Sequence, residues 1–261
     1  MFNIVYDIGV ITDIGNIRKK NEDSVLVLKG KINRDEFSLL LVADGMGGLE
    51  SGEIASRVVV DAFKKWWDND LKTIAQENFD LNTIKNSLEV TIENINKKIY
   101  SLKEQNIKSG TTLILVFIYK KQYIMCNVGD SRLYLIDNKG LNQISIDQTW
   151  CEDEIRAGRM ARGEENGHKM KNVLTSALGI KNNYTLQSEI GFIHDEYILI
   201  CSDGFYAYIN EYNLYKKIKK YKNCQDALEN MKNEIKEKRA HDNLTAVLLS
   251  VKRNILNGII N

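Results

Sequence analysis

Acidic residues stand at the ends of several strand-like apolar runs in this sequence. The carboxylates at these ends belong to Glu22 with its neighbour Asp23, Asp44, Asp130, Asp203 and Asp242. Most of them adjoin Gly, Ser or Asn, so each one alone is also explained by ordinary turn or capping chemistry. Antiparallel strands bring their ends to a shared rim, and five such ends predict that these carboxylates meet at one opening.

A divalent cation is the group that such a cluster would hold. Carboxylates close together repel one another, and burial adds a desolvation cost, which a cation offsets. Oxygen ligands suit Mg²⁺ or Mn²⁺ rather than zinc, and the three histidines are scattered singly, at His168, His194 and His241. The glycine after Asp44 leaves the carbonyl of Gly45 accessible as a further ligand. Two such ions roughly 3.5–4 Å apart activate a water and clamp a phosphoryl group.

Arg18 is the residue whose type and position suit a phosphate. The planar guanidinium of arginine matches two phosphate oxygens. Arg18 lies in GNIRKKNEDS, four residues before Glu22 and close to the predicted acidic rim. An ordinary solvated arginine beside Lys19 and Lys20 has the same spacing, so both interpretations stay open at this point.

The elements that would position these residues are mostly strands. Strand-like runs are SVLVLKG, FSLLLVADG, TTLILVFIY, QYIMCNVGD, SRLYLID, LNQIS, EYILICSDG and LTAVLLSVK, which are rich in β-branched and aliphatic residues. The turns YKKQY and DNKGL predict hairpins and antiparallel neighbours. Apolar residues at helical spacing predict long helices over 51–67 and 80–102, with Ser51 and Asp80 as their N-caps. Further helices are expected over 211–221 and 225–239.

These elements predict an α+β protein in which helices cover antiparallel sheets. No linker rich in Pro, Gly or Ser divides the 261 residues, so a single domain over 1–261 is expected. The segment Asp147–Lys171 is highly charged and lacks a clear apolar period. We expect it to form a flap beside the core.

Composition excludes several classes of protein. Lys+Arg 36 against Asp+Glu 35 gives a formal net charge of +1, which argues against a strongly basic nucleic-acid binder. No apolar run approaches the roughly 20 residues that span a bilayer, and the first residues do not resemble a secretory signal. The cysteines show no metal or disulfide spacing, which favours a reduced, cytoplasmic protein; they are Cys126, Cys151, Cys201 and Cys224.

An ordered set of motifs is similar to that of a known family. The motifs are DIGNIRKKNEDS, LLLVADGMGGLESGEIAS, SGTTLILV, CNVGDSRLYLI, NVLTSALG, ILICSDG and HDNLTAVLL. They resemble, in this order, the type 2C metal-dependent serine/threonine protein phosphatases in their bacterial form. The resemblance runs from about Asp7 to Val251 and implies a four-layer α-β-β-α sandwich, with two antiparallel sheets flanked by helices.

The resemblance also implies a role for each acidic residue. Asp44 resembles the carboxylate that bridges two metal ions, and Gly45 resembles the carbonyl ligand beside it. Asp203 and Asp242 resemble the other ligands of one ion. Glu22 resembles the residue that holds the second ion, partly through water. The implied cofactor is two Mn²⁺ or Mg²⁺ ions.

Four further positions take their implied roles from the same motifs. Asp130 resembles a ligand of a weaker third ion, and Arg18 resembles the phosphate-binding arginine. Asp23 and Asn243 correspond to residues that support the ligands from behind. Arg18 and Asp44 are thereby the implied catalytic residues.

The implied reaction is hydrolysis of phosphoserine and phosphothreonine in proteins by a water that bridges the two ions. No covalent phosphoenzyme is needed. A Ser/Thr kinase and its targets are the expected partners of a monomer that binds neither nucleic acid nor membrane. Two alternatives stay open: a pseudophosphatase that binds metal and recognises phosphoproteins, and a phosphatase of small metabolites.

Two positions depart from the family pattern. Met46 stands where eukaryotic relatives carry a histidine after the Asp-Gly step, which removes a candidate general acid. Gln148 stands where the family often has a histidine after Asp147. The metal ligands are unaffected, but the support that this region gives to the site has to differ.

Overall fold

Two five-stranded sheets form the centre of the molecule. The computed structural model describes residues 2–32, 35–46, 51–77, 79–194 and 197–255. The first sheet has the order β1 (Phe2–Asp13), β12 (Leu244–Ile255), β11 (Tyr197–Cys201), β8 (Arg132–Asp137) and β9 (Gly140–Gln143). The second has the order β10 (Gln187–Phe192), β7 (Gln122–Val128), β6 (Leu113–Tyr119), β3 (Asp35–Ala43) and β2 (Ser24–Ile32). Neighbouring strands are antiparallel in both sheets.

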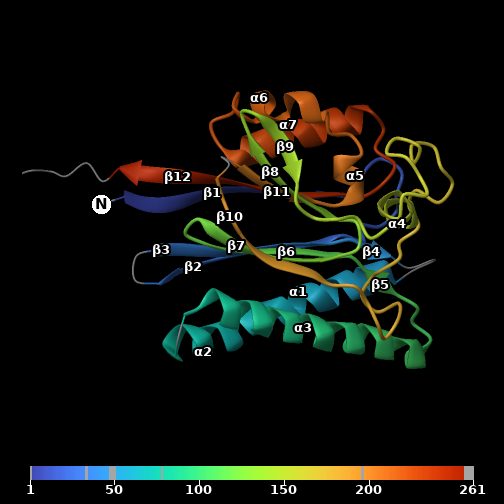
Figure 1. Ribbon diagram of the computed structural model, residues 1–261, viewed down its shortest axis with the longest axis horizontal. Coiled ribbons are helices and arrows are strands. Elements are labelled where there is room, and N and C mark those ends of the chain that lie inside the picture. The colour runs from blue at the N-terminus through green and yellow to red at the C-terminus, as the bar shows by residue number, and fades with distance from the viewer. Residues whose placement is uncertain (1, 33–34, 47–50, 78, 195–196, 256–261) are drawn as a thin grey trace, which may run out of the picture.

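Helices cover the outer faces of both sheets, as Figure 1 shows. Below the second sheet lie α1 (Gly52–Asp68), α2 (Asp70–Glu77) and α3 (Leu81–Ser101), the last followed by η1 (Leu102–Gln105). Above the first sheet lie α5 (Asp203–Tyr206), η2 (Glu211–Asn213), α6 (Leu214–Ile218) and α7 (Cys224–Glu237). The expected four-layer α-β-β-α sandwich is confirmed. That the whole chain forms one domain stays a prediction.

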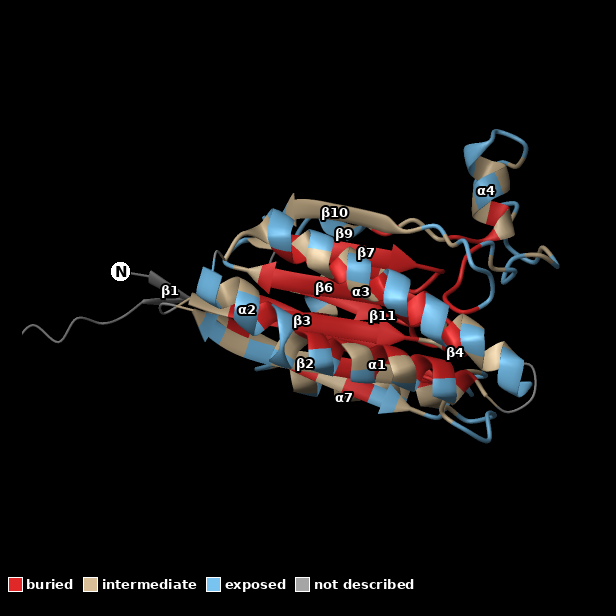
Figure 2. Cartoon of the chain, turned by 90° about the horizontal axis from the view of Figure 1, so that it is seen from below, coloured by how far each residue is buried: buried red, intermediate tan, exposed pale blue. Residues whose placement is uncertain are grey.

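Three apolar clusters separate the four layers. On β3, Leu39 and Leu41 pack toward α1 and α3, whereas Leu40 and Val42 pack between the two sheets. Successive side chains of a strand point to opposite faces. A strand covered on both faces therefore reads as a continuous apolar run, and the central strands are buried in Figure 2.

The predicted strands and long helices occur, and the structure adds elements that the pattern did not indicate. Strands β1 and β10 are edge strands, and β10 is only half-buried. The segment 147–171 contains a short helix, α4 (Trp150–Arg156), and the region 211–221 contains a shorter helix than expected. None of the described helices has the length and apolar character needed to cross a membrane.

The two predicted N-caps have different outcomes. The Asp80 side chain accepts a hydrogen bond from the Thr83 amide at 2.9 Å, so the cap of α3 is confirmed. Ser51 occupies the N-cap position of α1, but its side chain makes no capping hydrogen bond. Its hydroxyl instead donates to the carbonyl of Lys108 at 3.1 Å. The predicted position of the Ser51 cap is therefore confirmed, but its hydroxyl bonds to a partner distant in sequence in place of the helix.

Candidate active site

A cavity of ≈ 550 Å³ brings the predicted site residues together. It lies where strands of both sheets end, beside the short two-stranded sheet of β4 (Gly45–Met46) and β5 (Gly110–Thr111). Its lining includes all seven residues predicted to bind metal or phosphate, namely Arg18, Glu22, Asp44, Gly45, Asp130, Asp203 and Asp242. The individual roles of these residues stay predictions.

Asp44 is held in place through its backbone. It follows the last residue of β3, and its amide donates to the hydroxyl of Thr112 at 3.0 Å. Its carbonyl accepts from the Thr112 amide and from the Thr111 hydroxyl, each at 2.9 Å. The next residue has to be glycine, because a Cβ at Gly45 would lie 2.3 Å from the carbonyl oxygen of Gly52. The chain therefore presents the Asp44 carboxyl to the cavity with little freedom.

The other sheet contributes Asp203 and Asp242. Asp203 follows β11 and is the first residue of α5, and Asp242 lies just before β12. The two segments are packed closely, since a Cβ at Gly204 would lie 2.1 Å from the carbonyl oxygen of Asn243. Asp203 also lies close enough to Asp44 that its charge raises the pKa of the Asp44 carboxyl. Carboxyl groups from both sheets thus meet in the cavity.

The two predicted supporting residues connect segments around the cavity. The Asn243 side chain accepts from the Glu22 amide at 2.9 Å and donates to the carbonyls of Ile14 and Lys20, each at 3.0 Å. Asp23 is buried and accepts from the Ser202 hydroxyl at 2.9 Å. Its Oδ1 atom is buried without a hydrogen-bond partner among the described residues.

Gln148, which stands in place of the family histidine, braces the turn that carries Asp130. Its side-chain oxygen accepts from the Gly129 backbone amide at 2.8 Å, and its backbone amide donates to the Gly129 carbonyl at 3.0 Å. Gln148 is buried. The residue therefore supports the site through backbone hydrogen bonds that need no titratable group.

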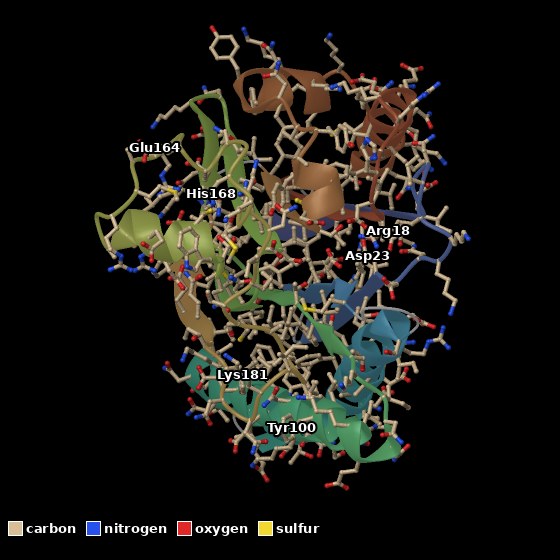
Figure 3. All side chains as sticks on the ribbon, turned by 90° about the vertical axis from the view of Figure 1, so that its right-hand side faces the viewer. Arg18, Asp23, Tyr100, Glu164, His168 and Lys181 are labelled. Atoms are coloured by element: carbon tan, nitrogen blue, oxygen red, sulfur yellow. The ribbon has the colours of Figure 1, made fainter. Side chains whose placement is uncertain are left out.

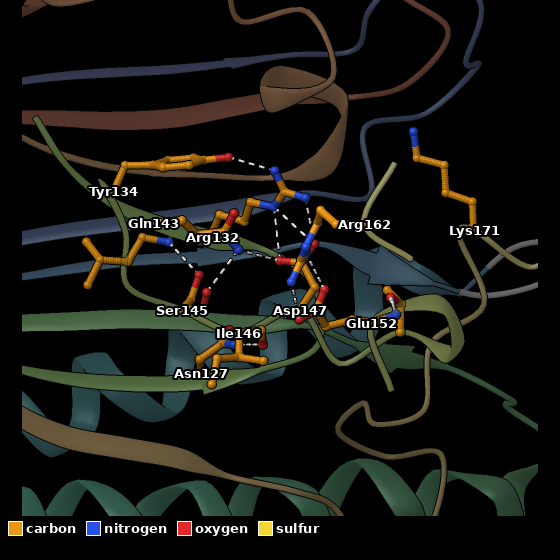
Figure 4. A network of polar contacts seen from close by, with 12 residues as sticks. Asn127, Arg132, Tyr134, Gln143, Ser145, Ile146, Asp147, Glu152, Arg162 and Lys171 are labelled. Atoms are coloured by element: carbon orange, nitrogen blue, oxygen red, sulfur yellow. Dashed lines mark hydrogen bonds and ion pairs between the residues drawn. The ribbon is translucent and has the colours of Figure 1, made fainter. Parts of the chain in front are cut away.

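Asp147 joins the base of the predicted flap to β8. The Arg132 guanidinium donates from Nε and Nη2 to Asp147 at 3.0 and 2.6 Å, and from Nη1 to the Tyr134 hydroxyl at 2.8 Å (Figure 4). The same guanidinium stacks 3.7 Å above the ring of Tyr206. Gln143 adds a hydrogen bond to Asp147 at 2.8 Å. This bidentate, partly buried pair fixes where the segment leaves the sheet.

Burial and mutual repulsion dominate the electrostatics of the carboxyl groups. Desolvation raises the pKa of Asp44 well above its ordinary value, and the neighbouring Asp23 and Asp203 raise it further. Desolvation and Asp203 raise the pKa of Asp130 to about 8. The pKa of Asp203 is raised by burial and by Asp242. The protein alone does not compensate these charges, which is the environment that a hard divalent cation would favour.

The carboxylates of the described residues line one cavity but are not arranged as a preformed metal site. Among the described residues, no three His, Cys, Asp or Glu side chains are arranged as a preformed ion site. Two predicted ligands bond to protein donors instead: Asp242 pairs with Arg18 at 2.6 Å, and Glu22 accepts from the Gly52 amide at 3.2 Å. The donor set, made of carboxylate and carbonyl oxygens, fits Mn²⁺ or Mg²⁺ by its chemistry.

Residues that the sequence did not single out form another part of the wall. They come from the segment between α4 and β10 and include Asn172, Thr175, Ser176, Ile180, Lys181 and Asn183. The motif NVLTSALG covers part of this segment, but no residue in it carries an acidic or strand-end signal. Its position beside the cavity depends on tertiary contacts.

A family model described as protein phosphatase 2C matches residues 19–248. The chain belongs to the protein phosphatase 2C family. Members of this family are in general metal-dependent, which agrees with the cluster of carboxyl groups in the cavity. The family assignment that the motifs suggested is confirmed.

Named relatives of this phosphatase 2C chain are bacterial. It is 30% identical over 242 residues to the serine/threonine phosphatase stp of Listeria monocytogenes, covering 91% of this chain and 93% of the relative. It is 30% identical over 204 residues to the protein phosphatase PhpP of Streptococcus pneumoniae, covering 76% and 78%. The structure of the S. agalactiae serine/threonine phosphatase superposes with a TM-score of 0.84 at 27% identity, covering 95% of this chain and 100% of that one.

Proposed function

We propose that this protein hydrolyses phosphoserine and phosphothreonine residues of other proteins. The observation that carries the proposal is the cavity in which carboxyl groups from both sheets lie beside Arg18, in a chain of the phosphatase 2C family. An acidic cavity would repel a phosphate by itself. A site with this charge can receive phosphate only when a cation and the guanidinium offset the carboxylates.

Two Mn²⁺ or Mg²⁺ ions are the proposed cofactor, with a weaker third. Asp44, the Gly45 carbonyl, Asp203 and Asp242 would hold the core ions together with Glu22, and Asp130 lies on the same wall for the third ion. When bound, divalent ions stabilise negative charge on the phosphoryl group and lower the pKa of water.

The chain's own residues bind and orient the phosphoryl group. Arg18 is placed by its ion pair with Asp242, which directs the guanidinium toward the cavity that both residues line. Its remaining N–H groups can donate to two phosphate oxygens. A cysteine nucleophile has no support, because Cys201 is fully buried and burial raises the pKa of its thiol.

The proposal extends to partners and location. A cytoplasmic monomer would act on phosphoproteins made by a Ser/Thr kinase, with that kinase among its targets. The names of the bacterial relatives support the phosphoprotein part.

Hydrolysis assays test the proposal. Purified protein with Mn²⁺ should hydrolyse both p-nitrophenyl phosphate and a phosphothreonine peptide, and the Asp44→Asn variant should lose both activities. If wild-type protein hydrolyses neither and Asp44→Asn behaves identically, the chain is a pseudophosphatase. Turnover of sugar phosphates without phosphopeptides would instead identify a metabolite phosphatase.

A further inference from the structure

The charged residues of the cavity wall include one cation outside the acidic cluster. Two cations line the cavity, Arg18 and Lys181. Arg18 is already paired with Asp242 at 2.6 Å. Lys181 is exposed, and among the described side chains no carboxylate forms an ion pair with it. Of the two cations, Lys181 is therefore the one without an ion-pair partner among the described side chains.

Helix α3 fixes the backbone on which Lys181 stands. Asn96 is 1% exposed, and its side-chain amide donates to the carbonyls of Lys181 at 3.2 Å and Asn182 at 2.9 Å. Its side-chain oxygen accepts from the Gly179 amide at 2.7 Å. Through these three bonds, one buried side chain holds three residues of the segment 179–182. A ligand of Lys181 would meet a preorganised backbone, and binding would then cost less ordering entropy.

Close packing supports the same conclusion. Gly179 has a φ of +82°, and a Cβ there would lie 2.1 Å from Cγ2 of Ile99 on α3. The positive φ and the short distance both exclude a side chain at Gly179, so this turn of the wall packs directly against α3. The next residue, Ile180, is 41% exposed and lines the cavity. An apolar contact and a cation thus stand side by side on a fixed turn.

Arg18 and Lys181 lie on different parts of the same face. In the view of Figure 3, Arg18 and Asp23 are labelled toward the level of the sheets, whereas Lys181 and Tyr100 are labelled at the level of α3. A phosphoryl group bound among the carboxyl residues would accept hydrogen bonds from Arg18. The position of Lys181 suits an anion elsewhere on the same substrate.

We propose that Lys181 selects phosphopeptides that carry Asp or Glu beside the phosphorylated residue. This inference rests on the proposed protein phosphatase function and names its substrate class. The phosphate group of the substrate is the alternative anion that Lys181 would bind. A flanking carboxylate is favoured because Arg18 already stands at the acidic cluster.

Three phosphothreonine peptides that differ in one flanking residue, Glu, Gln or Lys, provide the test. Wild-type protein should show a KM roughly two- to fivefold lower for the Glu peptide than for the Gln peptide, the range of an exposed ion pair. Lys181→Gln should remove this difference, and Lys181→Glu should reverse the order of the Glu and Lys peptides. Lys98→Glu is the matched control, since it makes the same charge change at an exposed position of α3 outside the cavity lining.

The possible failures are distinguishable. If wild-type protein hydrolyses all three peptides with equal KM, the inference is wrong while the proposed function stands. If Lys181→Gln raises KM equally for all peptides and for p-nitrophenyl phosphate, Lys181 binds the phosphate and the inference is overturned. If no phosphopeptide is hydrolysed, the proposed function fails and the inference fails with it.

Discussion

At the scale of single residues, the carboxyl groups of the cavity are unfavourable for the protein alone. Asp130 is buried, Asp44 and Asp203 are half-buried, and all three have a raised pKa because of desolvation and of their mutual proximity. Apolar residues at these positions would make the protein more stable, because a buried charge without a partner is costly. Their presence together indicates that they serve a ligand rather than stability.

The first prediction concerns Asp203. Asp203→Asn should lower kcat by more than about 100-fold, since loss of a ligand should exceed the 10–100-fold cost of losing a residue behind one. The fold should be retained, because the change removes one charge from a repelling cluster. Activity with Mn²⁺ and thermal melting measure the two effects.

Asp61→Asn is the control for this substitution, because Asp61 is exposed on α1 away from the cavity lining. It should leave both activity and melting unchanged. Full activity in Asp203→Asn would remove this residue from the catalytic site. A melting temperature many degrees below wild type would show that Asp203 is a structural residue instead.

At the scale of elements, local patterns were predictable and long-range contacts were not. The carboxylates could be predicted because each stands where an apolar run meets turn residues, and both features are local. The Asp80 cap was predictable for the same reason. The missing capping bond of Ser51 and the unrecognised Lys181 have one cause. The surroundings of these residues depend on Lys108 and on Asn96, partners distant in sequence.

Two of the four edge strands, β1 and β10, were missed for a related reason. Strand β10 is half-buried, so it lacks the apolar run that marks a central strand such as β3. Strand β1 contains Gly9, which is required because a Cβ would lie 2.5 Å from the backbone of Cys224 at the start of α7. A glycine within a run weakens the strand pattern, although here it permits close packing.

The second prediction tests the link between α3 and the cavity wall. Asn96→Ala removes the partners of the Gly179 amide and of the Lys181 and Asn182 carbonyls. Buried groups left without partners cost about 1–3 kcal/mol each, and water entering the space recovers part of this. We therefore expect a loss of stability of at least ~1 kcal/mol, with a larger rise in KM for phosphopeptides than for p-nitrophenyl phosphate.

Denaturant unfolding and peptide kinetics measure these effects. Asn94→Ala is the matched control, because Asn94 is exposed on the same helix. It should change neither quantity. Equal stability of Asn96→Ala and Asn94→Ala would contradict the role assigned to the buried amide.

At the scale of the whole molecule, the cavity joins the two sheets. Asp44 follows a strand of one sheet, and Asp203 and Asp242 flank strands of the other. The buried hydrogen bond from Ser202 to Asp23 crosses the same boundary. Figure 1 shows β4, α4 and α5 gathered at this end of the sandwich. A cation bound by both sets of carboxylates would therefore stabilise the packing of one sheet on the other.

The last prediction follows from this arrangement. A ligand that binds only the folded state stabilises it by about 2.7 kcal/mol at a hundredfold excess over its Kd. For a chain of this size, that corresponds to a rise in melting temperature of roughly 5–10 °C. Mn²⁺ should produce such a rise in wild-type protein, and Asp44→Asn should reduce it, since Asp44 lies between the two sets of carboxylates. If millimolar Mn²⁺ leaves the melting temperature of wild-type protein unchanged, the carboxyl groups do not form a cation site.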